Sequence, residues 1–320
     1  MDSDTDLPVM KDAMEILSES SLPYEVSTIS AHQTPAKMYS YASNAEERGI
    51  RVIIAGMIAS LTRLPVIGVP LHASALNGMD SLLSMVQMPR GVPVATVAVD
   101  NAASAGFLAG RILGLDNLEL LARSDPPSLI MNVNNEPGYG LNNSKEVTER
   151  RRLNALLLNA SSMKYDSHFC LLSAVSPRVE IIMESDSDLP IMKEAARVLI
   201  DFGVPHEVAF LVTSTSLCLS QHCMVASLTP LPVIGVPVRT STLDGIDSLV
   251  SITQMRGNVP VATVAINNSA NAALLAVRMW GLVDAGLRAR MRQYQEDMRD
   301  DDLRKAEKLN KVGWESYLNH

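Results

Sequence analysis

Short apolar runs rich in valine, leucine and isoleucine, with prolines at their edges, recur along this chain. The runs are Leu64–Val69, Val92–Val99, Leu231–Val236 and Val259–Ile266. Continuous apolar runs of this length are typical of strands buried on both faces of a sheet. In the first half of the chain these runs alternate with two segments, Ser74–Met88 and Asn101–Leu113, whose apolar residues recur at helical spacing. The order strand, helix, strand, helix predicts an α/β fold with a parallel sheet and right-handed crossovers.

This pattern is present twice, because Ser60–Gly114 and Ser227–Gly281 align without a gap. Both segments contain the phrases LPVIGVP and VPVATVA at matching positions. We conclude that one ancestral unit was duplicated. Ligands of parallel sheets bind beyond the carboxyl ends of the strands, so the loops after the four apolar runs are candidate binding loops.

Upstream of the shared half, the two copies differ. A phrase at Asp2–Met10 (DSDTDLPVM) returns at Glu184–Met192 (ESDSDLPIM), and only the second is preceded by a predicted strand, Val179–Met183. The first copy continues with a predicted strand, helix and strand, at Glu25–Ile29, about Ala36–Arg48 and Arg51–Ala55. The second copy is shorter here, so we expect it to lack a helix and a strand.

The repeated Ser–Asp phrase is read as a loop that enters a helix, with Pro8 in the first turn and Ser and Asp residues as caps. A capped helix start offers free N–H groups that suit a phosphate. Ordinary helix capping explains the same residues.

His32 is predicted to lie at a strand end just before a helix. An imidazole with a pKa near 6.5 would be a usable proton carrier at neutral pH. A solvated or capping histidine is the alternative reading of this residue.

The composition excludes several classes of function. A formal charge of −8 and a pI near 5.3 argue against nucleic acid or an anionic membrane as a partner. Three cysteines suit a reducing compartment. Cys218, His222 and Cys223 are too few to form a zinc site, so we expect no metal. No apolar run approaches the length of a membrane span, and the start, Met-Asp-Ser-Asp, predicts no signal or transit peptide.

We divide the chain into four segments. Residues 1–124 form the first copy, 125–178 a linker, 179–284 the second copy, and 285–320 a charged C-terminal helix that we expect to pack on a neighbouring subunit or domain.

Several phrases in the same order resemble the PurE family, the carboxyaminoimidazole ribonucleotide mutases and phosphoribosylaminoimidazole carboxylases of purine (IMP) biosynthesis. They are SDTDLPVMKDA and SDSDLPIMKEA for the family's G-S-x-S-D loop, SAHQTP for S-A-H-R-T-P, LPVIGVP, and DSLLSMVQMPRGVPVATVA. The C-terminal RMRQYQEDMRDDDLRKAEKLNKVGWESYLN resembles the plant carboxylases in particular.

The resemblance implies a flavodoxin-like three-layer sandwich, here as two incomplete tandem copies, which assembles as a homo-oligomer without metal or organic cofactor. It implies a phosphorylated aminoimidazole ribonucleotide as substrate, a lyase or mutase reaction, and a plastid location like that of the plant enzymes. His32 would be the general acid/base. The substrate-binding residues would be Ser3, Asp6, Ser30, Gln33, Ser185 and Asp188.

The chain departs from the family pattern at three places. The glycine before the serine is Asp2 in one copy and Glu184 in the other, and the phosphate-binding arginine after the histidine is Gln33. The Gly/Ala-rich loop with its own histidine is missing from the first copy, where Ala55-Gly56 runs directly into Met57.

These departures keep a second hypothesis open, a catalytically impaired tandem paralogue that only binds nucleotide or associates with intact relatives. A flavin-binding module is a third reading, disfavoured because aromatic residues make up only 4% of the chain.

Overall fold

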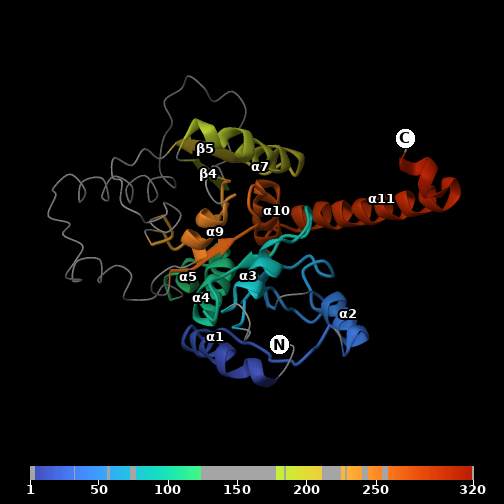
Figure 1. Cartoon of the computed structure of the whole chain (residues 1–320). Helices are drawn as coiled ribbons and strands as arrows, with labels where there is room; N and C mark the ends of the chain where they lie inside the picture. Colours follow the sequence, from blue (N-terminus) through green and yellow to red (C-terminus); the bar gives the residue numbers. More distant parts are fainter. Residues whose placement is uncertain are drawn as a thin grey trace.

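A five-stranded sheet built from both copies is the centre of the computed structural model (Figure 1). The structure describes residues 4–31, 33–55, 58–72, 77–123, 178–183, 185–210, 225–227, 229–239, 244–253 and 259–318. The sheet has the order β1-β2-β3-β7-β6. Its strands are β1 (Ile53–Ile54), β2 (Val66–Gly68), β3 (Ala95–Thr96), β6 (Val233–Gly235) and β7 (Val261–Thr263). Each lies inside one of the runs expected to form strands, so those predictions are confirmed.

Within each copy the strands pair in parallel, but the copies join through an antiparallel pair, β3 with β7. Thr96 lies opposite Thr263, which is its equivalent in the repeat alignment. Two equivalent residues that face each other across an antiparallel pair place the copies about a pseudo-two-fold axis, as in a symmetric dimer.

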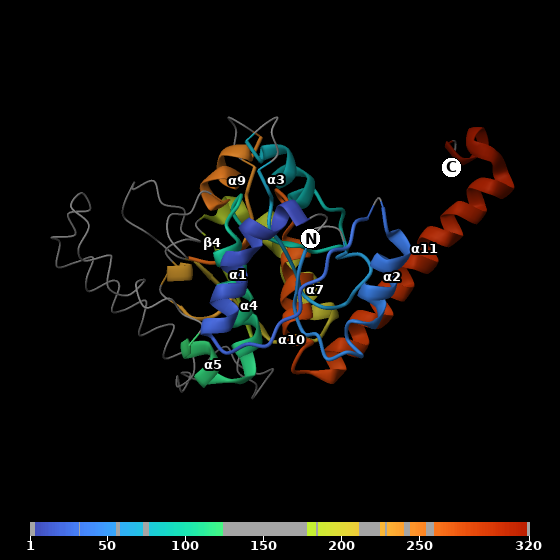
Figure 2. The ribbon, with the colours of Figure 1, turned by 90° about the horizontal axis from the view of Figure 1, so that it is seen from below.

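Helices cover both faces of this sheet and form the expected three-layer α/β arrangement. One face carries α1 (Leu7–Glu19), α4 (Ala102–Leu113), α7 (Leu189–Asp201) and α10 (Ser269–Trp280), which share the largest apolar core. The other face carries α2 (Pro35–Asn44), α3 (Met79–Val86) and α9 (Ile246–Thr253). Figure 2 shows α3 and α9 side by side at the top of the view, away from α4 and α10. A short helix, α5 (Leu118–Arg123), packs on α4.

The side chains along β2 explain the two faces. Ile67 belongs to the core beneath α4, whereas its neighbour Val66 belongs to the cluster beneath α2. Successive side chains of a strand point to opposite faces, so a continuous apolar run is required where both faces are covered.

Buried arginines tie the copies together reciprocally. Arg111 at the end of α4 donates from Nη1 to the carbonyl oxygen of Ala226 at 3.0 Å, and its equivalent Arg278 in α10 donates to the carbonyl oxygen of Ala59 at 3.0 Å. Ala59 and Ala226 are themselves equivalent in the repeat. Such reciprocal contacts are the mark of a two-fold interface.

A separate two-stranded parallel sheet is formed by β4 (Val179–Met183) and β5 (His206–Phe210). The strand expected at Val179–Met183 is therefore confirmed. The strand expected at Glu25–Ile29 is wrong, because residues 22–30 have no regular structure. Its equivalent in the second copy is β5, which pairs with β4, and the described part of the first copy has no strand equivalent to β4. Without a partner strand, residues 25–29 form no backbone ladder, and the Thr28 carbonyl instead accepts from the Lys37 side chain at 3.0 Å.

The helix starts follow local signals. Asn101 caps α4, with its side-chain oxygen accepting from the Ser104 backbone N–H at 2.9 Å. The helix α3 is shorter than predicted and begins after Asn77 and Gly78, which both have positive φ. The helix α2 ends at Asn44 rather than at Arg48.

The charged C-terminal helix is α11 (Ala285–Leu318), with a non-helical residue at Gly313. Leu287 and Met291 are buried in the main core, and Tyr294 meets the Phe202 ring edge-on with centroids 5.6 Å apart. Residues 299–313 are exposed, and Figure 1 shows this end projecting away from the sheet. The first turns of α11 therefore pack on both copies of the same chain, since Gln295 also donates to the Thr62 carbonyl oxygen at 3.2 Å.

Candidate active site

The Ser–Asp turn of the second copy lies just beyond the carboxyl end of β4. Residues 186–188 form a 3-10 turn that leads directly into α7. The Ser185 Oγ accepts from the Ser187 backbone N–H at 3.2 Å and donates to the Asp186 carboxylate at 3.1 Å. Asp188 takes the N-cap position of α7, but its side chain makes no capping hydrogen bond. Its carboxylate instead accepts from the Ser187 hydroxyl at 3.4 Å.

The first copy repeats this turn. Residues 4–6 form a 3-10 turn that leads into α1, and Asp6 stands at the N-cap without a side-chain capping bond. Thr5 donates to the Asp6 carboxylate at 3.5 Å, as Ser187 does to Asp188. Ser3 lies outside the described residues. The same local sequence thus gives the same turn twice. Of the Ser and Asp residues expected as caps, Ser185 caps the turn before α7, whereas the side chains of Asp6 and Asp188 make no capping bond.

Ser30 and Gln33 belong to a second turn, which starts α2. The Ser30 hydroxyl accepts from the Gln33 backbone N–H at 3.3 Å, and the Ser30 carbonyl accepts from the Thr34 backbone N–H at 2.9 Å. His32 lies outside the described residues, so its expected proton-carrying role remains a prediction.

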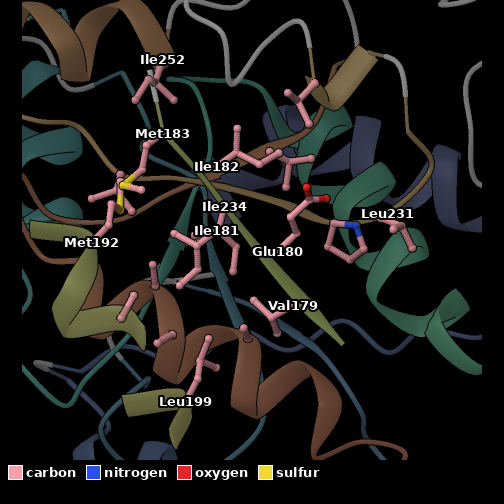
Figure 3. Close-up of a pocket in the computed structure, with 18 of the residues that line it drawn as sticks. Val179, Glu180, Ile181, Ile182, Met183, Met192, Leu199, Leu231, Ile234 and Ile252 are labelled. Atoms are coloured by element: carbon pink, nitrogen blue, oxygen red, sulfur yellow. The ribbon is translucent and has the colours of Figure 1, made fainter. Parts of the chain in front are cut away.

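A cavity of about 590 Å³ opens between β4 and β6 (Figure 3). Its walls are mainly apolar, with Ile181 and Met183 from β4 and Ile234 from β6 (Figure 3). In the first copy the place beside β2 is taken by β1, whereas β6 has no such neighbour among the described residues. The cavity therefore lies on the side of the sheet where the second copy was expected to lack a strand.

The polar groups of this cavity come from the turn and from α9. They are Asp188 from the turn and Asp247, Ser248 and Ser251 from α9, and they are joined by Thr229 before β6 and by Arg178 and Glu180 at β4. Of the expected site residues in the described part of the chain, only Asp188 lines the cavity; Asp6, Ser30, Gln33 and Ser185 do not. Of the four candidate binding loops, the one that starts at Val236 contributes to the lining.

The residues from α9 were missed in the sequence. Asp247 and Ser248 begin the phrase DSL, which also occurs at Asp80-Ser81-Leu82. A polar pair repeated at the start of the helix after a candidate binding loop was the available signal. It looked like helix capping, because Asp is favoured in a first turn.

The charged groups around the cavity are mostly carboxylates. Burial raises the pKa of Glu180, and the Glu207 carboxylate opposite it on β5 raises it further. Arg178 also lines the cavity, but its guanidinium donates to Asp284 at 2.7 Å. That hydrogen bond holds the pKa of the Asp284 carboxyl below its ordinary value. A ligand here would find hydrogen-bond acceptors and an apolar wall, which suits hydroxyl and amine donors.

The described residues contain no group of three or more His, Cys, Asp or Glu side chains that could hold a metal ion. Cys218, His222 and Cys223 lie outside the described residues, as does nearly all of the expected linker, 125–178. Within the same described ranges, no helix combines the length and apolar character that crossing a bilayer requires.

Comparison with known proteins identifies relatives of both copies. Residues 1–125 and 219–301 match the model of a family described as AIR carboxylase. An N5-carboxyaminoimidazole ribonucleotide mutase from Pyrococcus horikoshii is 61% identical over 129 residues, which cover 38% of this chain and 73% of the relative. The corresponding mutase from Thermotoga maritima is 60% identical over 129 residues. A chloroplastic phosphoribosylaminoimidazole carboxylase from Vigna aconitifolia is 47% identical over 190 residues, 52% of this chain but only 33% of the relative.

Proposed function

Because this chain belongs to the AIR carboxylase family, we propose that it binds a phosphorylated aminoimidazole ribonucleotide and moves a carboxyl group on or off the ring carbon, as a step of purine biosynthesis. The observation that carries the proposal is the Ser–Asp turn, which takes the same form at the start of α1 and of α7. The names of the relatives, mutases and carboxylases of this ribonucleotide, support it.

The proposed roles follow from the chemistry of each group. Backbone N–H groups at the start of α7 carry partial positive charge and would bind the phosphate near Ser185. The Asp188 carboxylate would accept hydrogen bonds from ribose hydroxyls at the mouth of the cavity. The apolar wall of β4 and β6 would cover the aminoimidazole and exclude water.

In the carboxylation direction, the ring carbon bonds to the carboxyl carbon and then loses its proton. We propose His32 as the base that takes this proton and as the acid that returns it in the reverse direction. The second copy has no histidine at the equivalent place, so the first copy would supply His32, with Ser3, Asp6, Ser30 and Gln33. The second copy would supply Ser185 and Asp188.

Assembly and location are part of the same proposal. We propose that the chain forms a homo-oligomer and acts in a plastid, by analogy with the relative named chloroplastic. No metal or organic cofactor enters the proposed reaction, and the substrate is the one small-molecule partner.

A turnover assay with the ribonucleotide and bicarbonate, combined with calorimetry, tests the proposal. We expect His32→Asn to abolish turnover while binding persists, because the proton carrier is lost and the phosphate site is kept. We expect Asp188→Ala to weaken binding by about tenfold, the effect of losing a charged hydrogen bond. Asp201→Ala is the control, since Asp201 is an exposed carboxylate at the far end of α7 that does not line the cavity.

A second candidate function, ribonucleotide binding without turnover, is favoured by the charge of the cavity. Its one basic side chain in the described lining, Arg178, is held by Asp284, and Gln33 stands where the family pattern has arginine. Binding to folded protein without any turnover would establish this second function. Absence of binding as well would contradict both.

A further inference from the structure

A second cavity, of about 270 Å³, lies at the seam between the two copies. Arg51 and Arg63 line it from the segments that precede β1 and β2. Arg278, near the end of α10, and Arg288, in the first turns of α11, line it from the second copy. The cavity is therefore at the amino ends of the strands, whereas the Ser–Asp turn of α7 follows the carboxyl end of β4.

The guanidinium of Arg278, which lines this cavity, makes fewer hydrogen bonds than it has donors. Its side chain is only 2% exposed, and its Nη1 donates to the Ala59 carbonyl oxygen at 3.0 Å. Its Nε and Nη2 are buried and have no hydrogen-bond partner. Burial lowers the pKa of Arg278 to about 10, which shows how poorly its charge is compensated.

The remaining arginines add positive charge to the same space. Arg63 and Arg288 share a single carboxylate, Glu46, at 3.6 and 3.4 Å. Arg51 pairs with Asp116 at 3.4 Å, and Asp116 does not line the cavity. Four guanidinium groups thus line a space in which Glu46 is the one carboxylate among the described lining residues.

Arg111, the equivalent of Arg278 in the first copy, shows that the repeat alone does not explain why four arginines surround the seam cavity. Arg111 is equally buried, and its Nη1 reaches two carbonyl oxygens, of Ala226 at 3.0 Å and of Leu231 at 3.4 Å. It lines neither of the two cavities described here. Arg111 therefore joins the two copies as Arg278 does, without lining either of these cavities.

We infer that the seam cavity is a binding site for a small oxyanion of the phosphate class, distinct from the site of the proposed reaction. Guanidinium groups attract such oxygens by their positive charge, and the buried, unbonded Nε and Nη2 leave the charge of Arg278 uncompensated in the wall of the cavity. Arg63 and Arg288 line the same cavity and add positive charge to it. Because the ligand would contact both copies, its binding would stabilise their association.

Titration of the full-length chain with inorganic phosphate at constant ionic strength tests this inference, by calorimetry and by thermal unfolding. The native chain should bind phosphate saturably and show a rise in Tm. Arg278→Met should weaken this binding by about tenfold, because it removes an uncompensated positive charge from the wall of the cavity. Arg111→Met is the matched control and should keep the affinity, since it removes an equally buried arginine that does not line the cavity.

Arg63→Gln provides a variant whose folding is not at risk, because the Arg63 side chain is 28% exposed. It should weaken phosphate binding several-fold. Ser185→Ala separates this site from the Ser–Asp turn and should leave seam binding intact. A parallel titration with ribose 5-phosphate distinguishes free phosphate from a phosphate ester as the preferred ligand.

Three results would overturn the inference. They are the absence of saturable binding, equal affinity in the native chain and in the Arg278→Met and Arg63→Gln variants, and loss of all phosphate binding in Ser185→Ala. A rise in Tm that sodium chloride reproduces at equal ionic strength would also overturn it, because charge screening would then explain the stabilisation.

Discussion

The packing of the two copies against each other is tested most directly at Leu82 and Leu249. These residues are equivalent in the repeat, lie in α3 and α9, and share one buried apolar cluster, with exposures of 2% and 0%. Each substitution to alanine removes three carbon atoms, worth about 0.8 kcal/mol apiece in transfer free energy, or about 2.4 kcal/mol. The cavity left behind raises the expected loss of unfolding free energy to about 3–4 kcal/mol for each variant.

Urea unfolding followed by circular dichroism measures these losses. Because the two leucines share neighbours across the seam, the double variant Leu82→Ala/Leu249→Ala should cost less than the sum of the single changes, by about 0.5–1 kcal/mol or more. Leu199→Ala is the control, because Leu199 is 0% exposed but belongs to the main core. Its loss of unfolding free energy and that of Leu82→Ala should add, within about 0.5 kcal/mol, in the double variant. If the losses of unfolding free energy from Leu82→Ala and Leu249→Ala were additive, or if the protein unfolded in two separate transitions, the joined arrangement of the copies would be refuted.

Two further predictions concern local strain and pH. Gly78→Ala should cost about 2–4 kcal/mol, because its φ is +78° and an added Cβ would lie 2.4 Å from a Val99 methyl, whereas Gly49→Ala, with φ +81° and open space around it, should cost only about 1 kcal/mol. Urea unfolding of both variants measures the difference, and equal losses would contradict the proposed clash. Glu180→Gln should stabilise the protein at pH 7. Burial and Glu207 raise the pKa of Glu180 in the folded state, so stability falls as pH rises from the ordinary value of 4.5 through the folded pKa. Thermal unfolding from pH 4 to pH 7 should show the advantage of the glutamine variant growing with pH, and a constant advantage would contradict this cause.

Much of the local structure was readable from the sequence. The strand at Val179–Met183 and the helix at Ala102–Leu113 have the expected bounds within a residue. The repeat, the Ser–Asp phrases and the family resemblance were also visible. These features depend on near neighbours in the chain, namely apolar period, capping residues and turn composition, and local physics is sufficient to fix them.

Other features depended on contacts between distant residues. The Glu25–Ile29 segment has the composition of a strand but no strand to pair with, so its backbone remains irregular. Thr96 and Thr263 are identical in sequence context, and only the assembled sheet makes them partners in an antiparallel pair.

The buried arginines show most clearly what could not be predicted from the sequence. Arg111 and Arg278 occupy the same place in the two equivalent helices of the repeat, α4 and α10. In the fold, one makes hydrogen bonds to two carbonyl oxygens, and the other keeps two free donors beside a basic cavity. The helical position of each arginine was determined by the sequence alone. What each one bonds to was decided by the tertiary structure, because the desolvation of a charge depends on the groups that folding brings around it.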